Sequence, residues 1–153
     1  MAAARYFTLD EANELVPQIA SAMERALQIH GLLRQALAQL GQAGVQISGD
    51  VLTGETTVRA PPEIERLIVH ARMLYTSLQD EVGAIEGLGA EVKDVESGLV
   101  DFHSFLDGAE EVLLCWRIGE PAIEHYHGLT TGFAGRKPTR GHAFAATPPG
   151  SPD

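Results

Sequence analysis

Residues 91–118 read EVKDVESGLVDFHSFLDGAEEVLLCWRI, and this stretch determines the fold class. It contains three short runs rich in Val, Leu, Phe and Trp, which are typical of strands. The runs cover residues 91–95, 98–106 and 111–118. The pairs Ser97-Gly98 and Asp107-Gly108 separate them with residues that favour tight hairpin turns. The stretch therefore predicts a three-stranded antiparallel meander.

A long helix is predicted before this meander, because apolar residues recur there at steps of three and four. Thr8 and Glu11 have the spacing of a capping box, which places the start of the helix at Leu9. The apolar stripe continues at heptad spacing to Leu40. Pro17 removes one amide donor early in the helix, so we expect a kink there.

A second apolar stripe follows Pro62 and ends at Ile85, just before Gly87. Residues 41–61 are rich in turn formers and predict a loop, with room for a short strand pair. The two helices then form an antiparallel hairpin over residues 9–87. A stripe this wide needs a third layer, either a sheet or a second chain, to cover it.

The predicted fold class is α+β, with the long two-helix hairpin packed against the three-stranded sheet. Pro121 suits the first position of a short C-terminal helix over residues 123–127. Residues 1–138 are expected to form a single domain, with the sheet and a functional site within residues 90–138. The glycine, threonine and proline content of residues 139–153 predicts a flexible tail.

Composition narrows the class of protein. The chain has 153 residues, 44% of them apolar, and a formal net charge of −10, which disfavours binding to a nucleic acid backbone. Its one cysteine cannot form an internal disulfide. No apolar stretch has the length of a membrane span or the form of a signal peptide. We therefore expect a soluble cytoplasmic protein that binds neither nucleic acid nor membrane.

Metal-ligating residue types gather between residues 101 and 127. In a helix, steps of four and three would place Glu120, Glu124 and His127 on one face. Together with Asp101 they predict a site for a divalent metal, zinc or iron, because imidazole and carboxylate suit those ions. Asp101 and Glu120 are also the candidate catalytic residues. A surface helix end with no metal is the alternative interpretation.

Each of three further residues of this region, His103, His125 and Cys115, has more than one interpretation. Asp101 and His103 share one strand face, so they could form an acid and base pair, or simply be exposed polar residues. His125 lies on the same face as His127 only if this segment is extended. Cys115 sits in an apolar strand, where an inert buried thiol is the commonest case.

Cations of this region could bind a small anion. Residues 132–137 place glycines beside Arg136 and Lys137, and such loops can form an amide concavity for a carboxylate or phosphate. Arg117 is a further candidate contact, although an internal ion pair is at least as common for an arginine among so many acids. A glycine-rich turn that only docks Phe133 is the alternative.

Several motifs of the chain recur together in one known family. They are Phe7-Thr8-Leu9, Val92-Lys93-Asp94, Gly98-Leu99-Val100-Asp101-Phe102, Leu114-Cys115-Trp116-Arg117, Gly119-Glu120, His127 and Gly132-Phe133-Ala134-Gly135-Arg136. Over roughly residues 5 to 138 the chain resembles a family of small bacterial proteins known as domain of unknown function 2203. The resemblance implies a bacterial cytoplasmic source, but no reaction, substrate or cofactor. In that family the positions of His103 and His125 are not usually histidine, which leaves Asp101, Glu120 and His127 as the stronger set.

Two functional hypotheses follow. The first is a metal-binding homodimer, associated through the helical hairpin, that could catalyse metal-assisted hydrolysis. The second is a non-catalytic dimeric interaction module whose helical stripe engages another protein. Binding of a small anion at Arg117 and Arg136 is compatible with both.

Overall fold

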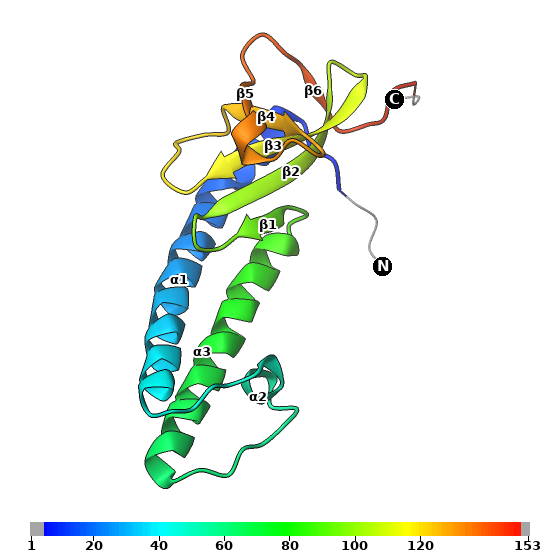
Figure 1. The fold of residues 1–153 in the computed structure, drawn as a ribbon. Helices are drawn as coiled ribbons and strands as arrows, with labels where there is room; N and C mark the ends of the chain where they lie inside the picture. The colour runs from blue at the N-terminus through cyan, green and yellow to red at the C-terminus, as the bar shows by residue number, and fades with distance from the viewer. Residues whose placement is uncertain (1–4, 151–153) are drawn as a thin grey trace.

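The computed structural model describes residues 5–150, which form two long helices and an antiparallel sheet (Figure 1). The helices are α1 (Leu9–Gln42), α2 (Gly49–Thr53) and α3 (Pro62–Glu86). The strands are β1 (Glu91–Asp94), β2 (Leu99–Leu106), β3 (Glu110–Arg117), β4 (His125–Gly128), β5 (Lys137–Pro138) and β6 (Phe144–Ala145), with a 3-10 turn η1 (Phe133–Gly135) between β4 and β5. The predicted α+β class and the helical hairpin are confirmed.

The sheet is larger than the predicted meander. Its order is β1-β2-β3-β4-β5, and β6 pairs with β2, which makes six strands. The three predicted strands are confirmed as β1, β2 and β3. The short helix predicted over residues 123–127 is wrong, because His125–Gly128 form β4 along the edge of β3. Extended backbone there satisfies the free amides of β3 and buries Tyr126 on the core side of the sheet.

The segment expected to be a flexible tail also contributes to the sheet. Strand β6 pairs with β2 through Phe105 and Ala145, and Phe144 is buried in the core. Burial of the Phe144 ring holds this segment on the sheet, although the residues around it are mostly turn formers. Residues 151–153 of the predicted tail lie outside the described part of the chain.

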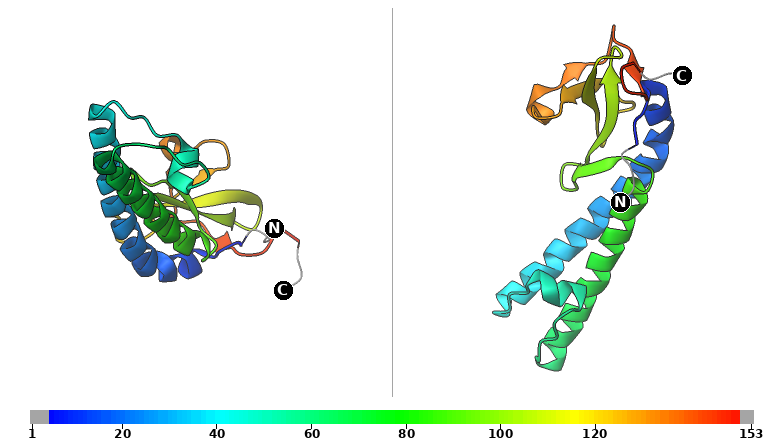
Figure 2. Two further views of the ribbon diagram at one scale, coloured as in Figure 1. Left: turned by 90° about the horizontal axis from the view of Figure 1, so that it is seen from below. Right: turned by 90° about the vertical axis from the view of Figure 1, so that its right-hand side faces the viewer.

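Helix α1 begins as the sequence predicts. The Thr8 hydroxyl accepts a hydrogen bond from the Glu11 amide at 3.1 Å, and the Glu11 carboxylate accepts one from the Thr8 amide at 2.9 Å. This capping box satisfies two amide donors that would otherwise lack partners. Pro17 lies inside the helix, and α1 curves along its length where it follows the sheet (Figure 2).

Two layers cover the apolar stripes of the hairpin. The N-terminal half of α1 packs on the sheet, where Ile19 and Met23 meet Phe102 and Trp116 in one core. At the other end of the hairpin, α1 and α3 form a second core, closed by Val51 of α2. Residues 41–61 thus contain a short helix instead of a strand pair. Within residues 5–150, no helix has a stretch long and apolar enough to cross a bilayer.

The two hairpin turns also form where the sequence places them. Gly98 has a φ of 68°, and a β-carbon there would lie 2.4 Å from the side chain of Ile118. Only glycine fits this close approach. Asp107 and Gly108 have φ angles of 51° and 70°, the left-handed pair of a tight turn that the Ala109 amide closes by donating to the Leu106 carbonyl at 2.9 Å.

Candidate metal centre

The sheet has one apolar face and one face with ionisable residues. Val100 and Phe102 of β2, with Leu114 and Trp116 of β3, pack against α1. Because side chains alternate along a strand, Asp101 projects from the opposite face. We call that side the ligand face of the sheet.

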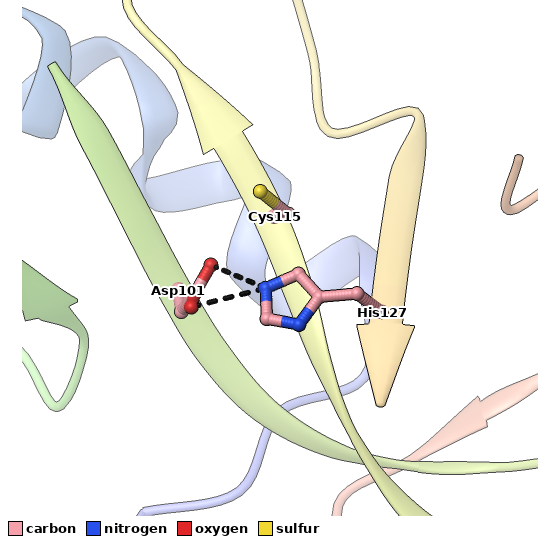
Figure 3. A group of neighbouring side chains, drawn as sticks. All are labelled: Asp101, Cys115 and His127. Atoms are coloured by element: carbon pink, nitrogen blue, oxygen red, sulfur yellow. Dashed lines mark hydrogen bonds and ion pairs between the residues drawn. The ribbon is translucent and has the colours of Figure 1, made fainter. Parts of the chain in front are cut away.

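Strand register builds the centre of the ligand face. Asp101 of β2 lies directly across from Cys115 of β3, which in turn lies directly across from His125 of β4. His127 is two residues further along β4 and therefore shares the face with His125. Figure 3 shows His127 facing the carboxylate of Asp101, with Cys115 on the strand between them. The exposed fractions of Asp101, Cys115 and His127 are only 1%, 0% and 3%.

His127 is held in one orientation by the backbone. Its Nδ1 lies 2.8 Å from the carbonyl oxygen of Gly128, which can only accept, so Nδ1 carries a proton. Its Nε2 lies 3.2 and 3.1 Å from the two carboxylate oxygens of Asp101. A neutral ring would therefore direct a lone pair at a buried carboxylate. The arrangement requires a proton or a metal cation between the two groups.

Cys115 adds a third donor to this pair. Burial, and then the charge of Asp101, raise the pKa of the Cys115 thiol to about 12. Without a cation the thiol is thus protonated at neutral pH, and a role as free nucleophile is excluded. A metal ion reverses this, because a coordinating thiol loses its proton.

The three donor atoms are close enough to share one ion. One ligand atom from each of Asp101, Cys115 and His127 lies within 4.8 Å of the other two. In a tetrahedral zinc site with bonds of about 2.0–2.3 Å, neighbouring donor atoms are roughly 3.3–3.6 Å apart. The nitrogen to oxygen distances of 3.1 and 3.2 Å between His127 and Asp101 are near that spacing.

A second network adjoins the cluster beside β4. Arg136 donates from Nη2 to Glu120 Oε2 at 2.6 Å and to His125 Nδ1 at 2.7 Å. The other oxygen of Glu120 accepts from the backbone amide of Arg117 at 2.7 Å. The guanidinium of Arg136 also lies 4.6 Å from the centre of the Phe133 ring. This network ties the loop after β4 to the turn before it.

A third network lies beside β1. His103 contacts Glu91 through Nε2 at 2.7 Å and Glu111 through Nδ1 at 3.0 Å. Burial lowers the pKa of His103, but these two carboxylates outweigh burial and raise it. The Glu91 pKa is lowered, first by Lys93 and then by His103. Tyr6 completes the network with a hydrogen bond to Glu111 at 3.2 Å.

The structure brings together two of the four predicted metal ligands. Asp101 and His127 meet in the cluster, whereas Glu120 belongs to the adjoining network with Arg136. Glu124 precedes β4, is exposed, and lines an open hollow beside His125. The predicted spacing of Glu120, Glu124 and His127 needed a helix, and an extended segment directs them differently.

Cys115 is the cluster residue for which the sequence predicts an inert thiol. The Asp107-Gly108 turn alone does not reveal its position, because the register depends on the length of the loop. A two-residue loop would set Asp101 across from Leu114, whereas the loop of residues 107–109 sets it across from Cys115. The extended reading of His125 and His127 then brings an imidazole to the same face.

The comparisons with known proteins agree with the resemblance. The sequence pattern of the uncharacterized conserved protein family DUF2203 matches residues 5–139, and the chain belongs to this family. No curated protein and no solved structure matches the chain. The function must therefore be argued from the ligand face itself.

Proposed function

We propose that the protein binds one zinc ion through Asp101, Cys115 and His127. The observation that carries the proposal is the convergence of three unlike donors, an oxygen, a sulfur and a nitrogen, in a buried site on three adjacent strands. Rigid strands hold such donors more precisely than loops do. The Gly128 carbonyl supports the site by orienting His127, as outer hydrogen bonds commonly do for metal-bound histidines.

The donor chemistry favours zinc over the hard cations. Magnesium and calcium prefer sites made only of oxygen ligands, whereas thiolate and imidazole suit zinc. Charge balance supports the same choice. A divalent ion with the carboxylate of Asp101, the thiolate of Cys115 and the neutral ring of His127 has no net charge, which reduces the cost of burial. Ferrous iron has the same charge and remains an outcome of the metal analysis.

Three protein ligands leave a fourth position for a tetrahedral ion. That arrangement is typical of catalytic zinc sites, in which the metal activates a bound water. Metal-assisted hydrolysis is therefore the reaction class that we propose for this site. The chain's own contribution is to fix the ligands on the sheet and to exclude bulk water from Asp101 and His127.

The test is elemental analysis by plasma mass spectrometry on untagged protein purified without chelators. We expect about one zinc per chain in the wild type and a loss of most of it in Cys115→Ser and His127→Ala. His142→Ala is the matched control, because His142 also contacts an aspartate, Asp107 at 2.9 Å, but lies at the surface without a thiol. Its zinc content should equal that of the wild type.

Two outcomes would contradict the zinc site. One is wild-type protein that holds no metal even after incubation with zinc, iron or manganese. The other is a zinc content that Cys115→Ser and His127→Ala leave unchanged. Circular dichroism of each variant separates a lost ligand from a lost fold, because the helices do not depend on the metal.

A second proposal concerns the helical hairpin. The sheet and α2 cover most of its apolar stripe, but Val69 and Met73 of α3 remain 51% and 64% exposed, one turn apart. They flank a shallow hollow of about 360 Å³ on the same helix. We propose that two copies associate through this part of α3. Light scattering over a range of concentrations should show a dimer that Met73→Glu weakens, and a strict monomer would contradict it.

A further inference from the structure

A hollow lies on the ligand face at the end of the sheet where β2 begins and β3 ends. Its volume is about 310 Å³, which suits a small organic molecule. It is lined by Asp94, Ser97, Leu99, Arg117 and Phe133. None of these residues is a proposed zinc ligand, so the hollow is a separate feature of this face.

The strand register fixes the position of the hollow relative to the cluster. Leu99 of β2 lies directly across from Arg117 of β3, and Asp101 lies directly across from Cys115. The two pairs are two residues apart on each strand, so all four side chains project from the ligand face. Two residues of a strand span about 7 Å. The hollow therefore lies next to the cluster along the same two strands.

The hollow has a cation on one side and a carboxylate on the other. Asp94 of β1 pairs with Leu99, which in turn pairs with Arg117, so Leu99 lies between the two charged residues. The spacing of neighbouring strands separates the backbones of Asp94 and Arg117 by about 10 Å. The Asp94 carboxylate accepts a hydrogen bond from the Ser97 hydroxyl at 2.7 Å. An acidic ligand would therefore place its acid group at the Arg117 side.

The guanidinium of Arg117 is not used by the protein. The chain has 21 acidic residues, and Arg25, Arg34 and Arg136 each contact a carboxylate at 3.1 Å or less. In the part of the chain that the structure describes, only the backbone amide of Arg117 has such a partner, Glu120, and the side chain is exposed. An unpaired guanidinium presents a planar fork of donors that matches a carboxylate or a phosphate.

Phe133 gives the hollow an apolar wall. This residue is 41% exposed, and the centre of its ring lies 5.7 Å from the guanidinium carbon of Arg117. Leu99 adds apolar surface between the two charged sides. A ligand with an apolar body would cover both side chains and remove their surface from water. The lining thus combines one cation with two apolar surfaces.

We infer that this hollow binds a small molecule that has an apolar body and an acidic group, either a carboxylate or a phosphate. The acidic group pairs with the guanidinium of Arg117, and the body packs on Leu99 and Phe133. The inference does not rest on the proposed zinc site, because none of these three residues contributes to it.

The test is calorimetric titration of the full-length protein with two acids, benzoate and phenyl phosphate. We expect saturable binding of one molecule per chain, and the acid with the lower Kd distinguishes a carboxylate from a phosphate ligand. Benzamide, the neutral counterpart of benzoate, should bind about tenfold more weakly or less, because it cannot form a charged hydrogen bond with Arg117. Acetate, which has no ring, should also bind more weakly than benzoate.

Variants assign the binding to the hollow. Arg117→Gln should raise the Kd of both acids about tenfold or more, since the charged hydrogen bond is lost. Phe133→Ala should raise the Kd of benzoate as well, because it removes the apolar wall. Arg140→Gln is the matched control. It removes the same charge from an exposed arginine that lines a different hollow, beside His125, and its Kd should equal that of the wild type.

Three results would overturn the inference. The first is wild-type protein that binds neither acid, and this result depends on no variant. The second is an equal affinity for benzoate and benzamide, or an equal rise of Kd in Arg117→Gln and Arg140→Gln, which would reduce the effect to net charge. The third is a loss of acid binding after a chelator removes bound metal, which would place the acid on the metal. Protein that binds the acids but holds no zinc contradicts the zinc site alone.

Discussion

The two faces of the sheet bury residues of opposite chemistry. On the face against α1, Phe102 and Trp116 are enclosed by other apolar side chains. On the ligand face, Asp101 and His127 are enclosed with a thiol between the strands. Side chains alternate between the two faces along β2, so adjacent residues such as Asp101 and Phe102 lie in different environments. Neighbouring residues of one strand can therefore serve stability and binding independently, and variants of each face should show it.

The largest expected effect is on the apolar face. Phe102→Ala removes a fully buried ring that meets Phe7 edge to face at 5.3 Å. The lost transfer energy and the remaining cavity should lower the free energy of unfolding by about 3–5 kcal/mol. Urea denaturation measures the change, and the zinc content of the folded fraction should stay constant. A fall in the zinc content of the folded fraction together with the free energy of unfolding would show that the two faces do not act independently.

The next effect belongs to the ligand face and depends on metal. Because the proposed zinc site is formed only by the folded chain, free zinc at one hundred times its Kd should stabilise the wild type by about 2.7 kcal/mol. Thermal melting with and without zinc measures this, and a chelator should reverse it. Cys115→Ser should melt at one temperature in both conditions. A zinc response in that variant equal to the wild type would show that zinc stabilises the chain elsewhere.

A smaller effect tests the helix that covers the apolar face. Thr8→Ala removes the acceptor for the Glu11 amide and should cost about 1 kcal/mol of stability. The measurement is again urea denaturation. Zinc affinity, measured by competition with a chelating dye, should not change, because Thr8 caps α1 and does not contact the ligand face. A weaker zinc affinity would mean that α1 positions the metal ligands.

The smallest effect is a pH dependence at the same helix end. The Thr8 amide and hydroxyl hold the pKa of Glu11 below its ordinary value of 4.5. The stability this provides is present above the unfolded pKa and is lost as the pH falls through the folded one. Glu11→Gln should therefore be less stable than the wild type at neutral pH. The two proteins should converge in acid, and a difference that is constant across the pH range would contradict the assignment.

The sequence was sufficient for the elements whose signals are local. The capping box of Thr8 and Glu11 and the Asp107-Gly108 turn involve residues a few positions apart, and both form as predicted. The helix prediction for the segment before His127 is wrong because its turn signal, Pro121, also suits a helix start. Pairing with the free edge of β3, 10 to 16 positions earlier in the chain, decides that this segment is extended.

The candidate site was predicted in part for the same reason. Asp101 and His127 were recognised by residue type, and the structure brings them together. The sequence predicts an inert thiol at Cys115, because a single apolar strand does not indicate which residue lies across from it. Arg136 is a candidate because of its glycine-rich loop, and its hydrogen bond to His125 places it beside β4. Long-range pairing, more than local pattern, builds the ligand face.

Ser104 gives strand β2 a role in the order of folding. Its hydroxyl lies 2.6 Å from the Phe7 carbonyl, 97 positions earlier in the chain, and 3.3 Å from the Ala145 carbonyl, 41 positions later. Both ends of the described chain thus meet the strand that carries Asp101. Contacts of such sequence separation form late and slowly. On the ribosome, the hydrogen bonds of Ser104 can be completed only after Ala145 has emerged.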